Sequence, residues 1–306
     1  MSTSYRDPVP RASPSMAADI RPMNFGEILD GALVMYRRYF GLFFKLATVV
    51  LALPVLLLVY VSARWQGALL MRSQDPTVLL SFMAWFFPIL ILYYLASLVL
   101  TAGTVRIISD AYLDRTPRLQ DALALGLSKL WALVGVGLGK GVIVVLAGFG
   151  FALVVGVLAV MAKGAGAGGV LLIGVAGIAG AWFVVYVLCG YGVTTPVVVL
   201  EQLGSAFDAF RRSWELTRGL RGKVFGLGLV AFLLFNVLPN WVIQVPAALT
   251  RLTMPGVSIA LGALATIVPV ILSPAIAAVI TLMYYDLRVR REAFDLQVLG
   301  QRLGIV

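Results

Sequence analysis

Residue types that commonly carry catalysis are scarce in this sequence. Its 306 residues include no histidine, which removes the commonest general base and transition-metal ligand. The single cysteine, Cys189, lies within an apolar run, where a small buried hydrophobe is more typical than a reactive thiol. The glycine-rich stretch 163–169, KGAGAGG, lacks the spacing of a phosphate-binding loop. We therefore predict no catalytic residues, no metal site and no cofactor.

Three acidic residues recur at a regular spacing and could form ion pairs. Asp114, Glu201 and Asp286 lie 87 and 85 residues apart, each just after an apolar run. Their contexts, AYLDR, VVLEQ and YYDLR, are loosely alike. Each carboxylate could accept an arginine from a neighbouring amphipathic helix and so fix that helix to the end of the apolar run. The alternative is that the three acids are solvated, and the sequence leaves both interpretations open.

Basic residues form the second set that could bind a ligand. The net charge is +10, and the cations lie in the gaps between apolar runs, where anionic lipid headgroups are nearer partners than nucleic acid. A protein partner in the membrane or at its cytoplasmic face is the second expectation, and no nucleic-acid partner is expected. The residues predicted to contact a headgroup or a partner are Arg37, Arg38, Arg211, Arg212, Trp214, Arg218, Arg221, Lys223, Arg288, Arg290 and Arg291.

The composition identifies the surroundings in which these residues must work. Hydrophobic residues make up 61% of the chain and charged residues 12%, with a mean hydropathy of +0.98. A soluble domain would carry about a quarter charged residues, so lipid must surround this chain. Six apolar runs reach the length of about 20 residues that a membrane-spanning helix needs. We predict an all-α polytopic membrane protein with six transmembrane helices near residues 42–61, 78–101, 133–160, 170–199, 224–244 and 259–285.

Three short amphipathic helices are predicted in front of the odd-numbered spans. The segment 205–223, SAFDAFRRSWELTRGLRGK, begins at Ser205 with a capping box and places an aromatic face opposite a face of arginines. Asn24 predicts a similar capping-box start, and Thr116 with Pro117 predicts a start with proline at the first helical position. We expect these helices to lie in the plane of the cytoplasmic headgroups.

One amphipathic helix and the two spans after it form a unit that the sequence predicts three times. The three repeats are expected near residues 24–115, 116–202 and 203–288, within a membrane domain of residues 24–292. Residues 1–23 are rich in Pro, Ser and Arg and predict a disordered cytoplasmic tail. Residues 293–306 form a short cytoplasmic tail at the other end.

The distribution of cations predicts the orientation of the chain. Of the 24 Lys and Arg residues, 20 fall in the two tails, in the segments that follow even-numbered spans, or at the adjoining span ends. By the positive-inside rule, both termini are cytoplasmic. Arginine outnumbers lysine 19 to 5, which is typical of a GC-rich bacterial genome, so we expect a bacterial inner membrane. The cations on the opposite side are Arg64, Arg72, Lys163 and Arg251.

Three stretches of the chain resemble a known family. They are RPMNFGEILDGALVMYRRYF at residues 21–40, LEQLGSAFDAFRRSWELTRG at 200–219 and YYDLRVRREAFDL at 284–296. Together they resemble the membrane domain of bacterial glycerophosphoryl diester phosphodiesterases, which often occurs as a stand-alone protein. In fused members the catalysis belongs to a separate barrel with histidine and acidic residues. This chain has no such barrel, so the resemblance implies a membrane domain without phosphodiesterase activity.

Two functions remain from these observations. The first is a non-enzymatic membrane module that organises lipid or anchors a partner through its basic-aromatic cytoplasmic helices. The alternative is a passive lipid translocator or small-solute permease that uses the proline-containing fifth and sixth spans. Asn236, Asn240, Thr266 and Ser273 could line a polar cavity there, or they could satisfy the backbone of kinked helices. A lipid enzyme embedded in the membrane ranks below both.

Overall fold

The fold is known from a computed structural model that describes residues 21–71, 76–161, 166–251 and 253–293. All regular secondary structure in these residues is helical. Six segments are long and apolar enough to cross a membrane, which confirms the prediction of six spans and identifies a multi-pass membrane protein. These segments are Phe40–Trp65, Pro76–Tyr112, Leu130–Val160, Ile173–Leu200, Arg221–Thr250 and Pro255–Glu292.

The helices follow one another in three groups, each a short helix and then a long hairpin. In chain order they are α1 (Phe25–Arg38), α2 (Phe40–Met71), α3 (Pro76–Tyr112), α4 (Leu119–Ser128), α5 (Leu130–Met161), α6 (Gly166–Gly190), α7 (Thr194–Leu200), α8 (Ala206–Thr217), α9 (Arg221–Phe232), the π-helical segment η2 (Leu233–Val237), α10 (Leu238–Thr250) and α11 (Pro255–Glu292).

Several helices extend beyond the predicted spans. Helix α2 continues to Met71, where the sequence predicted a loop over 62–77. Helix α11 continues without a break through Pro269 and Pro274 into the charged segment that ends at Glu292. The predicted tails lie outside the described residues, apart from residues 21–23 and 293. Met23 is held by a hydrogen bond from its backbone N–H, so the folded part begins before residue 24.

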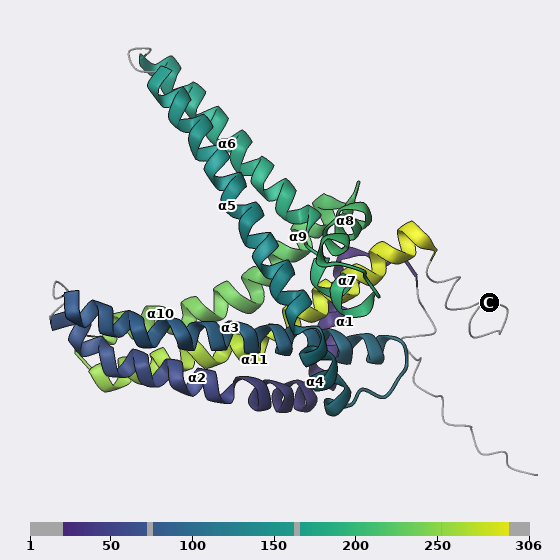
Figure 1. Cartoon of the computed structure of the whole chain (residues 1–306), viewed down its shortest axis with the longest axis horizontal. Helices are drawn as coiled ribbons and strands as arrows, with labels where there is room; N and C mark the ends of the chain where they lie inside the picture. Colours follow the sequence, from purple (N-terminus) through teal and green to yellow (C-terminus); the bar gives the residue numbers. More distant parts are fainter. Residues whose placement is uncertain (1–20, 72–75, 162–165, 252, 294–306) are drawn as a thin grey trace, which may run out of the picture.

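The buried core lies at one end of the molecule, which we call the hub. The hub consists of α1, α4, α7 and α8 with the adjoining ends of α2, α3, α5, α6, α9 and α11. Its fully buried side chains include Ile28 of α1, Ile107 of α3, Leu216 of α8 and Leu282 of α11. The described ends of the chain also meet there, and the three hairpins leave in directions away from it (Figure 1).

The hairpins are packed less closely than the hub. Helix α11 packs against α2, α3 and α10, whereas the α5–α6 hairpin diverges from that bundle (Figure 1). No residue in the most apolar part of α5 is buried. Lipid tails are as apolar as these side chains, so little hydrophobic force drives spans together, whereas helices near a polar interface still gain by burying their apolar faces.

Two of the short helices begin as the sequence predicts. The Asn24 backbone N–H donates to Glu27 Oε2 over 2.6 Å at the start of α1, and the Ser205 backbone N–H donates to Asp208 Oδ2 over 3.0 Å at the start of α8. The first of these bonds, together with the ion pair to Arg21, lowers the pKa of Glu27 below its ordinary value.

The predicted start of the remaining short helix is wrong. Pro117 is not the first helical residue, because Arg118 stays extended (φ −120°, ψ 139°) and serves as the N-cap of α4.

Helix α8 is attached to the end of α6 through Gly190. The last carbonyl groups of a helix lack partners within the helix. Here the Gly190 carbonyl accepts the hydroxyls of Ser213 at 2.9 Å and Thr217 at 3.2 Å. The Trp214 ring lies directly against Gly190, where a Cβ atom would overlap it. Glycine at this position therefore permits the close approach of the two helices.

We expect Gly190→Ala to lower the thermal stability of the purified protein in detergent micelles. Its Cβ would overlap the Trp214 ring, and overpacking of this kind costs about 1–3 kcal/mol. Gly174→Ala is the matched control, because it lies in the same helix and its Cβ would meet nothing within 4 Å. The control should melt at the wild-type temperature or slightly above it, since alanine favours helix. Equal melting temperatures for the two variants would contradict this contact.

Candidate functional site

A carboxylate that is fully buried joins three parts of the hub. Asp286 of α11 is 0% exposed. It accepts hydrogen bonds from Lys223 Nζ at 2.6 Å, from Arg290 Nε at 3.1 Å and from the backbone N–H of Met23 at 2.7 Å. The Lys223 ammonium also donates to the Met23 carbonyl at 2.6 Å. This cluster therefore fixes the segment before α1 and the start of α9 against the end of α11.

A second ionic cluster surrounds Glu201, which follows α7. Its carboxylate accepts Arg212 Nε at 3.0 Å and the Tyr284 hydroxyl at 2.9 Å. Arg212 also forms a close ion pair with Glu292, which accepts Arg288 Nε at 3.0 Å. Burial lowers the pKa of Arg212, but the hydrogen bond and charge of Glu201 and the charge of Glu292 outweigh it, so the net shift is upward. Helix α8 is thus held to α7 and α11.

The three predicted acids differ in the structure. Glu201 pairs with an arginine of the following short helix, whereas Asp286 pairs with Lys223 of the fifth span and with Arg290 of its own helix. Asp114 is exposed, with a left-handed φ of 63°. The buried acid near the end of α3 is instead Asp110, which accepts Arg106 Nε at 2.9 Å.

Arg221 has different surroundings from the other cations of the hub. It opens α9 and is 8% exposed. Its guanidinium carbon lies 3.6 Å from the ring centre of Trp214 and 3.9 Å from that of Tyr186. Its Nε and Nη1 atoms are buried and have no hydrogen-bond acceptor among the described residues. We call this arrangement the aromatic cage.

The predicted basic residues therefore divide into three groups. Arg212, Lys223, Arg288 and Arg290 form ion pairs within the hub. Arg221 lies in the aromatic cage with Trp214. The remaining cations are exposed, and they are Arg37, Arg38, Arg211, Arg218 and Arg291.

Exposed aromatic side chains lie close in sequence to several of these exposed cations. Phe40 is 43% exposed and follows Arg38, and Phe207 is 82% exposed one turn before Arg211. Trp131, at the start of α5, is 78% exposed. Aromatic side chains beside arginines suit the boundary between hydrocarbon and headgroups.

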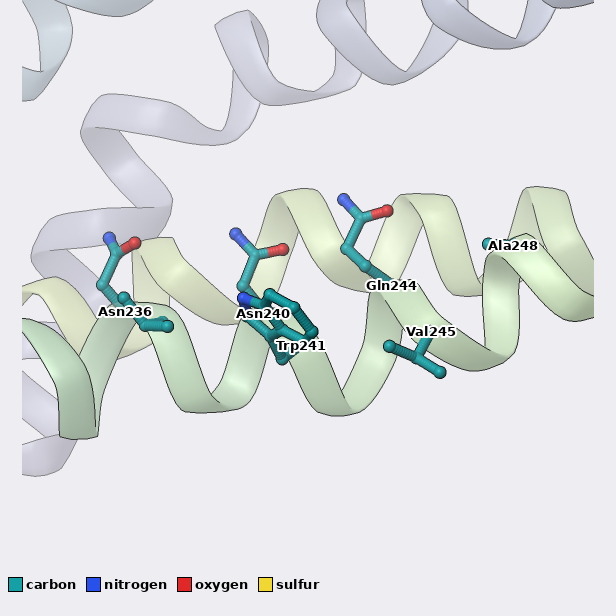
Figure 2. Close-up of a pocket in the computed structure, with 7 residues that line it drawn as sticks. Asn236, Asn240, Trp241, Gln244, Val245 and Ala248 are labelled. Carbon is teal, nitrogen blue, oxygen red and sulfur yellow. The ribbon is translucent and has the colours of Figure 1, made fainter. Parts of the chain in front are cut away.

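The fifth span contains a groove lined with amides, which we call the amide groove. It has a volume of about 400 Å³, and Figure 2 shows Asn236, Asn240 and Gln244 side by side on one face of the helix. Their spacing of four residues places them in this row. The Asn240 Oδ1 atom is buried without a hydrogen-bond donor among the described residues.

A π-helical turn, η2, lies at the end of the amide groove that follows α9. The Leu238 N–H donates to the Leu233 carbonyl five residues back, just before Pro239, which has no N–H to donate. π-Turns inside α-helices are frequent at functional sites.

The hydroxyls of Thr266 and Ser273, which the sequence predicted to line a polar cavity, donate hydrogen bonds to backbone carbonyl groups instead. Ser273 donates to the Val270 carbonyl at 2.9 Å, which Pro274 leaves without its helical partner, and Thr266 donates to the Gly262 carbonyl at 3.1 Å. Of the four predicted cavity residues, Asn236 and Asn240 line the amide groove, and Gln244 joins them.

Several residues that pair with the charged groups of the hub were not predicted from the sequence. Glu292 lies four residues after Arg288, a spacing that could have identified this pair. Tyr186 and Tyr284 are aromatic residues within apolar spans, and no local pattern marks them as partners of Arg221 and Glu201. The backbone N–H of Met23 carries no sequence signal at all.

Comparisons with protein-family models, curated proteins and solved structures gave no match. The resemblance to the membrane domain of glycerophosphoryl diester phosphodiesterases therefore stays a prediction. The geometry of the hub and of the amide groove carries the functional argument.

We expect Asp286→Asn to destabilise the protein strongly. The change leaves Lys223, whose side chain is 15% exposed, without its carboxylate, and breaking a buried ion pair costs about 3–5 kcal/mol. Thermal unfolding in detergent micelles measures the effect. Asp114→Asn is the control, since Asp114 is exposed and asparagine tolerates its left-handed backbone. A wild-type melting temperature for Asp286→Asn would contradict a structural role for this cluster.

Proposed function

We propose that this protein is a non-enzymatic integral membrane module that gathers anionic lipid around its hub. The observation that carries the proposal is the combination of exposed arginines and exposed aromatic side chains on the hub. Arg37, Arg38 and Arg211 lie near Phe40 and Phe207, outside the ion pairs that stabilise the hub. Arginine attracts headgroup phosphates, while an adjacent aromatic ring occupies the upper hydrocarbon region.

The orientation and the internal repeat are parts of the same proposal. The strong excess of cations on the hub side supports a hub at the cytoplasmic face of a bacterial inner membrane, with both termini in the cytoplasm. The helix order, a short helix and then a hairpin three times over, supports a threefold repeat. In this arrangement α1, α4 and α8 are the cytoplasmic interfacial amphipathic helices.

The chemistry of the hub supports a non-enzymatic role. The carboxylates of Glu201, Asp286 and Glu292 are engaged with cations. The described residues contain no group of three His, Cys, Asp or Glu that could hold a metal ion. A surface of this kind binds by charge and by insertion of aromatic rings, and the same surface would serve a protein partner with an acidic face.

We expect replacement of Arg37, Arg38, Arg211 and Arg218 by Gln to release anionic lipid. Each cation near an anionic surface contributes about 1 kcal/mol, so the ratio of anionic to zwitterionic lipid around the protein should fall about twofold or more. Extraction in copolymer discs with mass spectrometry of the retained lipid measures this ratio.

The control neutralises Arg64, in the last part of α2, and Arg251, directly after α10, which are both exposed and precede the turns of their hairpins. It should leave the lipid ratio at the wild-type value. An unchanged ratio in the four-residue variant, with the protein folded, would refute lipid gathering and favour a protein partner.

The amide groove supports a second candidate function, passive movement of lipid headgroups or small polar solutes. Its three amides would offer hydrogen bonds to a polar group inside the membrane. From Asn236 to Gln244 the row covers eight residues, about 12 Å at the rise of an α-helix. The hydrocarbon core is about 30 Å thick, more than twice the length of this row. The polar lining covers less than half the thickness of the membrane. Passive transfer is therefore the second candidate, after lipid gathering.

We expect any lipid transfer to depend on the amide groove. Replacing Asn236, Asn240 and Gln244 by Leu should reduce the rate at which a fluorescent lipid changes leaflet in proteoliposomes to that of empty vesicles. Thr266→Val is the control, because Thr266 bonds to its own helix. A wild-type rate no faster than that of empty vesicles removes the second candidate altogether.

A further inference from the structure

The aromatic cage holds a cation whose charge the described chain does not neutralise. Lys223, Arg212 and Arg106 each have a carboxylate within 3.0 Å. Arg221 is more deeply buried than the side chains of these cations, and no carboxylate of the described residues lies within ion-pair distance. A buried charge without a counter-ion is costly, so a bound anion would stabilise Arg221.

The two aromatic rings satisfy only part of the guanidinium. The guanidinium carbon lies over the rings of both Trp214 and Tyr186, whose electrons attract a cation. The N–H donors of a guanidinium lie in its plane, and Nε and Nη1 have no acceptor. An anionic group with several oxygen acceptors would suit these donors, and a phosphate has this character.

The start of α9 adds to the attraction for an anion. Arg221 is the first residue of this helix, and the preceding residue, Leu220, provides no side-chain cap. The N-terminus of a helix carries a partial positive charge and presents free N–H groups. The charge of Arg221 and the dipole of α9 therefore act on the same place.

The surroundings of the cage indicate which molecule carries the phosphate. Tyr186 is 46% exposed, and Trp182, one turn further along α6 from the hub, is 66% exposed. Trp182 packs edge-on against Phe225, one turn after Arg221, with ring centres 6.4 Å apart. These two rings extend an apolar surface from the cage along the spans, as the acyl chain of a lipid requires.

We propose that the aromatic cage binds one phospholipid, with its phosphate at Arg221 and an acyl chain along Trp182 and Phe225. The proposal rests on the proposed function in placing the hub at the level of the headgroups. Beyond that function, the proposal assigns one specific lipid-binding site to each chain. The lipid at this site is distinct from the lipids that the exposed arginines attract without a defined site.

The test is native mass spectrometry of the full chain in detergent with added phosphatidylglycerol. We expect one lipid to bind the wild type, and Arg221→Gln to weaken that binding at least tenfold. Arg221→Lys keeps the charge without the planar donors and should bind with intermediate affinity. The control, Arg251→Gln, removes an exposed cation that follows α10, outside both the cage and the group of exposed hub arginines, and should retain the bound lipid.

Two further measurements separate the alternatives. Glycerol 1-phosphate has the same phosphate without acyl chains; if it binds as well as the lipid, the ligand is a soluble phosphate compound and the lipid assignment is overturned. Thermal unfolding with and without phosphatidylglycerol gives an independent readout: the lipid should raise the melting temperature of the wild type and not that of Arg221→Gln.

The outcomes distinguish this site from the proposed function. If Arg221→Gln loses the single bound lipid while the ratio of anionic to zwitterionic lipid around the protein stays unchanged, the lipid site at the cage is supported. This conclusion does not depend on the result for the exposed arginines. If Arg221→Gln and the wild type bind and are stabilised equally, or if the wild type binds no lipid and gains no stability, the proposal is wrong. Should Arg221→Gln fail to fold, wild-type affinity in Arg221→Lys would equally refute it.

Discussion

The buried carboxylate of Asp286 is the interaction on which the hub depends. A fully buried charge must find its partners within the protein, and Asp286 finds them in Lys223, Arg290 and the Met23 backbone. These groups belong to the start of the fifth span, the end of the sixth and the segment before the first short helix. Their meeting at one carboxylate adds a polar connection among three chain segments that also pack through the hydrophobic core.

The uneven distribution of packing follows from the two media that such a protein meets. In the hub, α1 and α8 bury Ile28 and Leu216, as helices do where water or polar groups can reach them. Further into the membrane, the side chains of α5 remain exposed, since lipid solvates them as well as protein would. The molecule therefore combines a firmly packed hub with a hairpin, α5–α6, that has few neighbours and should be among its least constrained parts.

The arginines of the hub occupy three kinds of surroundings. Arg212 is neutralised by Glu201 and Glu292 and serves stability. Arg211 remains exposed, beyond the apolar face of α8, where headgroups or a partner can reach it. Arg221 is buried between Trp214 and Tyr186 and has no carboxylate partner in the described chain. In the proposed function, the first group stabilises the hub, the second attracts anionic lipid and the third binds one lipid.

The helices could be predicted from local sequence patterns, whereas their contact partners depend on how the helices pack together. Hydropathy located the six spans, and the capping boxes at Asn24 and Ser205 located two helix starts, because these features depend on residues within a few positions of one another. Local patterns could not reveal that Asp286 meets Lys223, since that pairing depends on how two spans approach. They also could not separate Arg221, enclosed by aromatic rings, from the exposed Arg218 three residues earlier. Burial and charge pairing belong to the assembled helices, and only the assembled helices show which cations remain available to bind.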